Sequence, residues 1–318
     1  MFKYSFCIIY YSNLTHRLQQ TYTNTEPGSR KVAGKYREGI RACFEIFKLG
    51  NLSVILGSQQ TKIMVTQFDE LTDSQWKITS QLLNMQRKRK NSLRDILNGM
   101  FFVLRTGCQW RNLPRNSYPK WQSVYYYYYR WTHDGTIESI NLSLNMHIRE
   151  QSGREATPSL GCVDSQSIKV APMIFEDKGI DGNKKINGRK RQVMVDTFGF
   201  VWACSVHAAN LSDTVMGCTL FDKISDKLLR LEKILVDGGY KGTFVEKAKN
   251  EHNITVEITS KPPSKKGFIP VAKRWVSERT FGWFNFFRRL SKDYEHSPRC
   301  AESMLLLANC AIILNRIN

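Results

Sequence analysis

Two short apolar runs that each end in an aspartate constrain the fold of this chain more than any other feature. The first, in LGCVDSQSIKV, places Asp164 after Leu160–Val163, and the second, in KILVDGGYK, places Asp237 after Lys233–Val236. Short apolar runs beside turn residues are typical of buried strands. A carboxylate at such a strand end is either a turn former or a metal ligand held on a rigid element.

A third acidic residue, Glu278, lies in RWVSERTFGWFNFFRRLSKDYE, residues 274–295, which we predict to be a helix. Two carboxylates on strand ends and one on a later helix would form a set of oxygen ligands that suits Mg²⁺. Two such ions about 3.5–4 Å apart can activate a water or a 3′-hydroxyl and stabilise the leaving oxygen of a phosphodiester.

Residues 71–107 have the periodicity of helices. Thr72 and Gln75 form a capping-box pattern before the first predicted helix. Ser92 begins a second helix of regularly spaced apolar residues, and Gly107 ends it. The connection between the two helices is a run of four basic residues, 87–90.

A third helix is predicted from Pro119 to about Gly135, and a fourth follows it. The third contains five consecutive tyrosines, Tyr125–Tyr129, which must cover several faces of a helix. Packing inside the protein and stacking on nucleic-acid bases are both open for these rings.

Beyond Gly153 the pattern changes to strands that alternate with helices. The expected elements are, in order, strands at 160–163, 192–198 and 201–207, a helix at 214–231, a strand at 233–236, a helix at 243–252, a strand at 254–258, and a helix from about 271.

The chain carries 47 Lys and Arg against 28 Asp and Glu, a formal charge of +19, which predicts a polyanionic partner. A merely solvated basic surface is the alternative. The eight cysteines show no metal-ligand spacing, so we expect core residues in a reducing compartment, the cytoplasm. Met304–Leu314 is too short to cross a bilayer and predicts a buried helix, so no membrane partner is expected.

Six blocks follow one another from about Leu71 to the C-terminus: LRDILNGMFFVLRTGCQWRNLP, VYYYYYRW with DGT, VDSQSIK, GRKRQVMVDTFGF with VHAANLSD, LVDGGYKG, and RWVSERTFGWFNFFRRLSKDYE. In these blocks the chain resembles bacterial insertion-sequence transposases of the IS-five type. Members of that family begin near FDELTDSQW, so the resemblance implies that Met64 is the native start. It also implies an N-terminal extension at 1–63, a helical DNA-binding domain at 64–155 and a catalytic domain at 156–318.

The implied fold is an α/β, ribonuclease H-like mixed sheet flanked by helices and preceded by a small all-helical domain. Its first and fourth strands are neighbours, so Asp164 and Asp237 should meet while the helix with Glu278 packs across the sheet. The resemblance makes these three residues the catalytic triad and the ligands of two Mg²⁺ or Mn²⁺ ions, with Asp164 shared between them.

The implied function is to bind terminal inverted repeats, to cleave the ends by metal-dependent hydrolysis, and to join the 3′-hydroxyls to target DNA. The implied partner is double-stranded DNA, both element ends and target, held by a homodimer. Two alternatives stay open: an impaired remnant that binds without cutting, and a nuclease that cuts without joining. Val271, Asn285 and Phe286 depart from the wider family signature.

Basic residues in three places are candidate DNA contacts. They are Arg87, Lys88, Arg89 and Lys90 of the turn, Lys184, Lys185, Arg189, Lys190 and Arg191 of a basic loop, and Arg274, Arg288 and Arg289 on the last predicted helix. A solvated loop is the alternative for the second group.

Four other residues are expected to be structural or to have an open role. Asp196 should be structural, Asp213 a helix N-cap, and His207 a satisfied buried histidine. Gly239 either forms a turn or lets the backbone approach phosphates.

Overall fold

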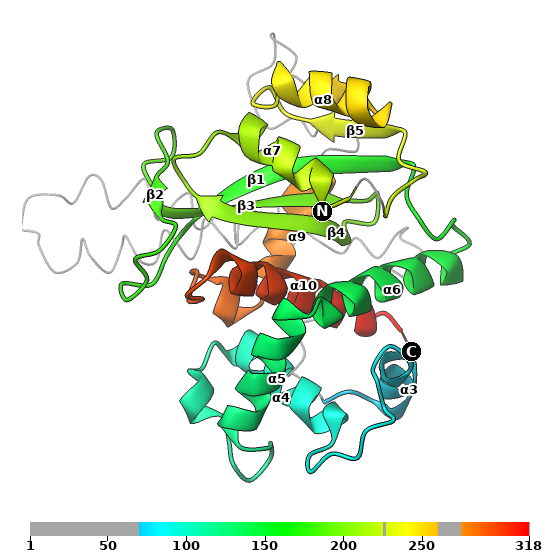
Figure 1. Ribbon diagram of the computed structural model, residues 1–318, viewed down its shortest axis with the longest axis vertical. Coiled ribbons are helices and arrows are strands. Elements are labelled where there is room, and N and C mark those ends of the chain that lie inside the picture. Colours follow the sequence, from blue (N-terminus) through cyan, green and yellow to red (C-terminus); the bar gives the residue numbers. More distant parts are fainter. Residues whose placement is uncertain (1–69, 225–226, 260–274, 318) are drawn as a thin grey trace, which may run out of the picture. The chain divides into compact units, whose positions relative to one another are not determined.

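The computed structural model describes residues 70–224, 227–259 and 275–317 (Figure 1). The chain divides into residues 1–64 and 65–318, and the described residues all lie in the second unit. The hypothesis about Met64 and the role of Arg274 therefore fall outside the described residues.

The first described part is helical, as predicted. Its elements are α3 (Asp73–Gln81), α4 (Leu93–Thr106), the 3-10 turn η1 (Trp110–Asn112), α5 (Trp121–His133) and α6 (Thr136–Gln151). The capping box is confirmed, because the Gln75 amide donates to the Thr72 hydroxyl at 3.2 Å and the Thr72 amide donates to Gln75 Oε1 at 3.0 Å. Gly107 ends α4 in the left-handed conformation, with φ of 70°, where a side chain would be strained.

A mixed sheet follows. Its strands are β1 (Leu160–Lys169), β2 (Gly179–Ile180), β3 (Asn187–Val195), β4 (Val201–Ala208), β5 (Lys233–Val236) and β6 (Thr255–Ile258). β4 pairs with β3 and β3 with β1 in antiparallel fashion, β1 with β5 and β5 with β6 in parallel, and β2 adds a short pairing to β3. The predicted neighbourhood of the strands that carry Asp164 and Asp237 is thus confirmed.

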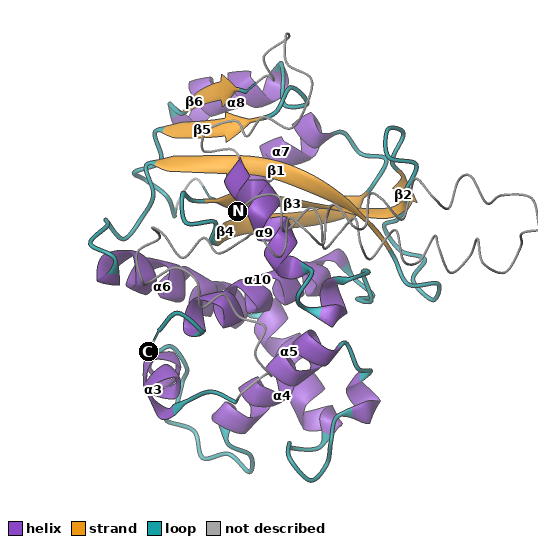
Figure 2. Ribbon diagram, turned by 180° about the vertical axis from the view of Figure 1, so that it is seen from behind, coloured by secondary structure: helices purple, strands orange, loops and turns teal. Residues whose placement is uncertain are grey.

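Helices cover both faces of the sheet (Figures 1 and 2). α7 (Asp213–Asp222) and α8 (Thr243–His252) lie on one face, and α9 (Trp275–Phe284) and α10 (Pro298–Leu314) on the other. Alternate strand residues serve the two cores, since side chains alternate along a strand. Val163 and Met194 pack on the α7 and α8 side, while Cys162 and Val193 pack on the α9 and α10 side.

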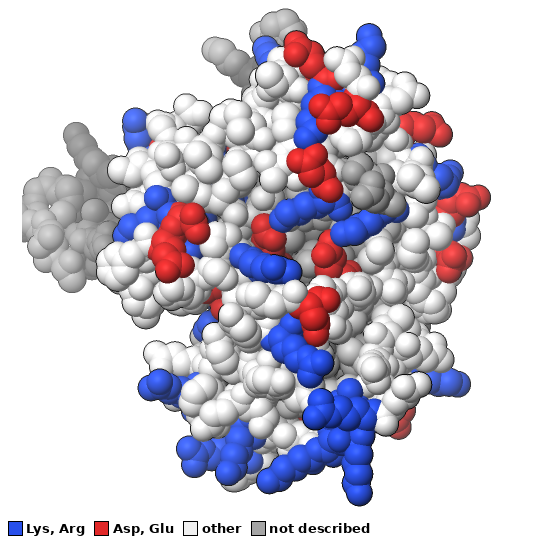
Figure 3. Space-filling model, in the orientation of Figure 1, with Lys and Arg blue, Asp and Glu red and all other residues white. Residues whose placement is uncertain are grey.

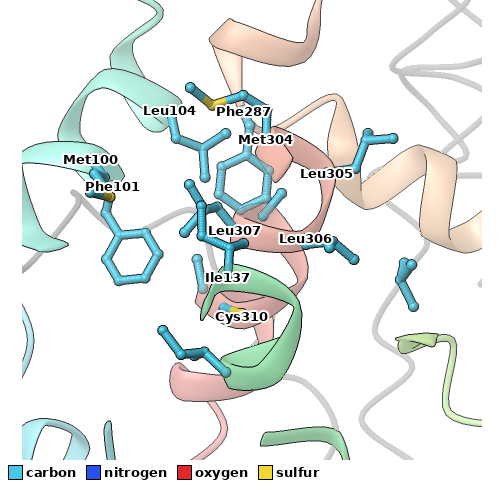
Figure 4. Close-up of a cluster of buried hydrophobic side chains, with 14 of the residues drawn as sticks. Met100, Phe101, Leu104, Ile137, Phe287, Met304, Leu305, Leu306, Leu307 and Cys310 are labelled. Atoms are coloured by element: carbon cyan, nitrogen blue, oxygen red, sulfur yellow. The ribbon is translucent and has the colours of Figure 1, made fainter. Parts of the chain in front are cut away.

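α10 is the common packing partner of the helical part and the sheet. It contacts β4 as well as α4, α5 and α6. Figure 4 shows Leu104 and Ile137 beside Leu307 of α10 in one continuous apolar cluster. The side-chain amide of Asn309 donates to the side-chain oxygens of Asn141 at 2.6 Å and Asn145 at 3.0 Å. The predicted separate helical domain is therefore not confirmed, because its core is shared with α10.

Several predicted boundaries are wrong. β1 runs to Lys169, not to residue 163, and α7 ends at Asp222, not at residue 231. β3 begins at Asn187, not at residue 192, so the basic residues 189–191 belong to a strand. The helix with Glu278 ends at Phe284 and is followed by the 3-10 turn η2 (Arg288–Leu290). Ser212 takes the N-cap position of α7, which leaves Asp213 inside its first turn.

The buried helix predicted at 304–314 is confirmed as part of α10. No helix in the described part of the chain combines the length and apolar character needed to cross a membrane. Cysteines 162, 204, 300 and 310 are buried, as expected of core residues.

Candidate active site

The parallel pairing of β1 with β5 places two aspartates next to each other. Cys162 pairs with Leu235, and Asp164 and Asp237 each lie two residues further along their strands. Paired strands run about 4.8 Å apart, so the two carboxylates start from adjacent backbone positions at one edge of the sheet. Both side chains are half-buried.

Helix α9 packs across β1 and β3 and reaches the first of these carboxylates (Figure 2). The Ser277 hydroxyl donates to Asp164 Oδ2 at 2.8 Å, and the Ser165 amide donates to Oδ1 at 2.8 Å. Glu278 follows Ser277 directly and is exposed to solvent. The third acidic residue is thus on the element that touches Asp164, one position beyond the contact.

A tight turn fixes the second carboxylate. The Gly239 amide donates to Asp237 Oδ1 at 2.9 Å, and a Cβ at Gly239 would lie 3.0 Å from the same oxygen. A residue with a side chain would crowd this bond, so the turn by itself accounts for the glycine.

The oxygen donors fit a hard divalent cation by their chemistry. Nevertheless, within residues 70–224, 227–259 and 275–317 no three His, Cys, Asp or Glu side chains are arranged to hold a metal ion. The strand pairing brings the backbone positions of Asp164 and Asp237 together. Glu278 lies one residue after Ser277, whose hydroxyl donates to Asp164 Oδ2.

A tyrosine that we did not predict lies beneath the two aspartates. Tyr240 is buried, and Gln192 Nε2 donates to its hydroxyl at 3.2 Å. Burial, and then the negative charges of Asp213, Asp164 and Asp237, raise the pKa of Tyr240 well above its usual value. The phenol therefore keeps its proton at neutral pH. Its sequence signal was its place three residues after Asp237.

The α7 side of the sheet carries a buried polar group of Lys190, His207 and Asp213. Lys190 Nζ lies 3.3 Å from the Asp213 carboxylate. His207 is buried, as predicted, and its Nδ1 lies 3.0 Å from the Ala208 carbonyl. In the described structure its Nε2 has no hydrogen-bond partner, so the prediction of a satisfied histidine is only half met. Burial lowers the pKa of His207.

Four predicted DNA contacts are buried and have other roles. Arg189 is fully buried against the segment 293–296. Arg191 donates to the Leu290 carbonyl at 2.9 Å, and burial lowers its pKa to about 10, which leaves it charged. Arg289 binds the Glu295 carboxylate at 2.8 Å, and Lys190 pairs as described above. Little of their cationic surface is exposed and each has a structural partner, so a phosphate contact by any of the four stays a prediction.

Asp196 is structural, as predicted. It is fully buried, and Arg149 Nη1 lies 2.7 Å from its Oδ2. The amides of Phe198 and Phe200 donate to Oδ1 and shape the hairpin between β3 and β4.

The other predicted cations stay at the surface. Lys184 and Lys185 follow β2 and are exposed, as is Arg288 of η2. The turn 87–90 joins α3 to α4 and is exposed except for the half-buried Arg89. Figure 3 shows Lys and Arg gathered over the helical end of the molecule, whereas both signs of charge alternate over the sheet and its helices.

Comparisons with known proteins agree with this arrangement. Residues 71–141 match a family model described as "Putative transposase of IS4/5 family", and residues 155–314, half of the chain, match "Transposase DDE domain". A protein of Burkholderia cepacia, "Putative transposase for insertion sequence element IS402", is 27% identical over 137 residues. That match spans 41% of this chain and 64% of the relative. The chain therefore belongs to the DDE transposases of the IS4/5 family.

Proposed function

We propose that this protein binds the terminal inverted repeats of an insertion sequence, cleaves the DNA at the element ends, and joins the freed 3′-hydroxyls to target DNA. The observation that carries the proposal is the placement of Asp164, in the middle of β1, beside Asp237, which directly follows the parallel neighbour β5; α9, with Ser277 and Glu278, packs against β1. The family match and the printed name of the relative support the same reaction.

Asp164, Asp237 and Glu278 would hold the metal, and we propose two Mg²⁺ or Mn²⁺ ions with Asp164 shared between them. Such ions, when bound, lower the pKa of a water or hydroxyl and stabilise the leaving oxygen. The two strands fix the first two carboxylates. The exposed Glu278 on α9 would supply the third.

The DNA partner follows from charge. The formal charge of +19 attracts a polyanion, and cations that neutralise phosphates release condensed counterions. We propose that the turn 87–90, Lys184, Lys185 and Arg288 contact phosphates. We further propose that the sheet has the ribonuclease H-like fold. We also propose a homodimer on DNA, because two element ends must be held together.

The test is a cleavage and joining assay with labelled duplexes that end in the inverted repeats flanking the gene, in Mg²⁺ or Mn²⁺. We expect nicked 3′-hydroxyl ends and joined products from the native protein. Asp164→Asn and Asp237→Asn should abolish both products while DNA affinity stays within about twofold. Glu251→Gln, an exposed carboxylate of α8, is the matched control and should behave as the native protein.

Each other outcome contradicts the proposal in its own way. Binding without any cutting identifies an impaired remnant, and cutting without joining identifies a nuclease. A loss of DNA binding by Asp164→Asn as large as its loss of cutting would make Asp164 a folding determinant.

A further inference from the structure

A hollow of about 390 Å³ lies between the turn after α3 and one side of α5. Residues 87–91 form one wall, and α5 contributes the other, with Gln122, Tyr126 and Arg130 among its side chains. Pockets that enclose a ligand begin at about 300 Å³, so the hollow has room for one small unit of a larger molecule. α10 lies between α5 and the sheet, so the hollow is separate from the carboxylate site (Figure 1).

The hollow is strongly cationic. Arg87, Lys88, Arg89, Lys90 and Arg130 all line it, and no acidic side chain is among its lining residues in the described structure. Arg89 serves its own turn, since its guanidinium donates to the carbonyls of residues 84 and 87. Arg130 Nε lies 3.5 Å from the Asp134 carboxylate, which neutralises part of its charge. Arg87, Lys88 and Lys90 are exposed beside it, and their like charges repel one another until an anion binds.

The five consecutive tyrosines have different roles, and two of them, Tyr126 and Tyr127, line this hollow. Tyr128 is buried and donates to the Cys300 carbonyl at 2.6 Å. Tyr125 packs on Trp110 with 5.4 Å between ring centroids, and Tyr129 on His133 with 4.1 Å. Tyr126 is 57% exposed and lines the hollow.

A large aromatic ring that is exposed among cations has its apolar face in water, which is unfavourable. A nucleic-acid base that stacks on the ring removes this face from water. Tyr127 lines the hollow as well and supports Tyr126, because the two rings meet at 83° with 5.6 Å between centroids. Phosphate charge and base stacking together indicate a nucleotide of a DNA strand whose base has turned out of the duplex, because neighbouring bases cover both faces of a paired base.

We propose that this hollow holds one nucleotide of the element end, with its phosphate against Arg87, Lys88, Lys90 and Arg130 and its base on Tyr126. The inference rests on the proposed function and deepens it, because it assigns the end-binding site. It also adds Tyr126 and Arg130, on α5, to the cations of the turn.

The test measures binding of a fluorescent element-end duplex by anisotropy, with the full chain and no divalent metal. We expect Tyr126→Ala to weaken binding about tenfold and Tyr126→Phe to stay within about twofold, because stacking needs the ring and not the hydroxyl. Tyr129→Ala is the matched control, since Tyr129 is 50% exposed on the same helix but outside the hollow. It should bind as the native protein.

A second measurement reads the phosphate contacts. Lys88→Gln and Arg130→Gln should each lower the slope of log affinity against log salt by about one. Melting temperatures within a few degrees of the native protein confirm that the variants fold. If Tyr126→Ala does not fold, the affinity of Tyr126→Phe and the two salt slopes test the inference in its place.

Equal affinities of the two alanine variants, a phenylalanine variant as weak as alanine, or unchanged salt slopes would overturn the inference. Since the binding assay needs no catalysis, a protein that fails to cut leaves this result intact. If the Tyr126→Ala protein binds DNA with native affinity and cuts it normally, the proposed nucleotide site in the hollow is refuted, but the proposed function is not.

Discussion

Arg189 offers the sharpest separation of a structural role from a DNA-binding role. Its guanidinium lies 3.2 Å from Asp293 Oδ2 and donates to the carbonyls of Glu176, Glu295 and His296, each at 2.8 Å. The side chain has no exposed surface. Arg189→Met keeps much of the volume and removes every one of these donors.

The expected cost follows from what the substitution leaves behind. Breaking a buried ion pair by removing one partner costs about 3–5 kcal/mol, because the remaining charge stays buried. Four carbonyls also lose a donor, counting that of Asp177 at 3.4 Å, and partial solvation of the loosened segment offsets some of that loss. We expect a decrease of about 4 kcal/mol in the free energy of unfolding, and a melting temperature lower by on the order of 10 °C.

Urea unfolding at neutral pH measures this loss, and anisotropy on the element-end duplex measures affinity below the transition. Lys184→Met is the matched control because it removes one positive charge from an exposed side chain. The control should keep its stability within about 0.5 kcal/mol and weaken DNA binding. The reasoning is refuted if Arg189→Met loses less than about 1 kcal/mol, or if the folded variant binds DNA more weakly than the control.

Three further outcomes are expected. Asn309→Leu should lower the free energy of unfolding by about 2–4 kcal/mol, since the Val201 amide and two asparagine oxygens lose their partner; a loss in urea below about 1 kcal/mol contradicts this. Burial lowers the pKa of His207 below its ordinary value of 6.5. As the pH falls, the unfolded chain therefore binds a proton at this ring before the folded protein does. The stability that depends on the neutral ring is complete above pH 6.5 and declines below it. His207→Gln should therefore flatten the fall in stability between about pH 7 and 5, and an unchanged slope argues against it. Mn²⁺ at about ten times its Kd should stabilise the native protein by about 1.4 kcal/mol, a rise of a few degrees in melting temperature, but not Asp164→Asn; equal shifts would place the metal elsewhere.

Local signals located the elements that depend on local chemistry. The bounds of β5 and α8 agree with the sequence pattern, because an apolar run and a capped helix need only neighbouring residues to be identified. The capping box at Thr72 and the left-handed Gly107 were visible for the same reason. The pairing of β1 with β5, which places Asp164 beside Asp237, was implied by the resemblance to the transposase family, in whose fold the first and fourth strands are neighbours.

The predictions that failed concern residues whose structural partners lie far away in the chain. Arg189 and Arg191 were predicted to contact DNA from a basic loop, because the carbonyls and carboxylates that bury them come from residues about 100 positions later. The helix with Glu278 was predicted too long, since only the packing of residues 285–290 sets its end. Tyr126 could not be told from its four neighbours until the helix fixed which ring faces which side.

The central position of α10 has a consequence for how this protein is made. Helices α4, α5 and α6 and strand β4 leave the ribosome long before residues 298–314, yet all of them pack on that helix. During synthesis the apolar surfaces of these elements therefore stay uncovered until residue 314 has been made. Only then can the helical part and the sheet complete their packing on α10. A stop codon that removes this one helix would thus leave neither part with a complete core.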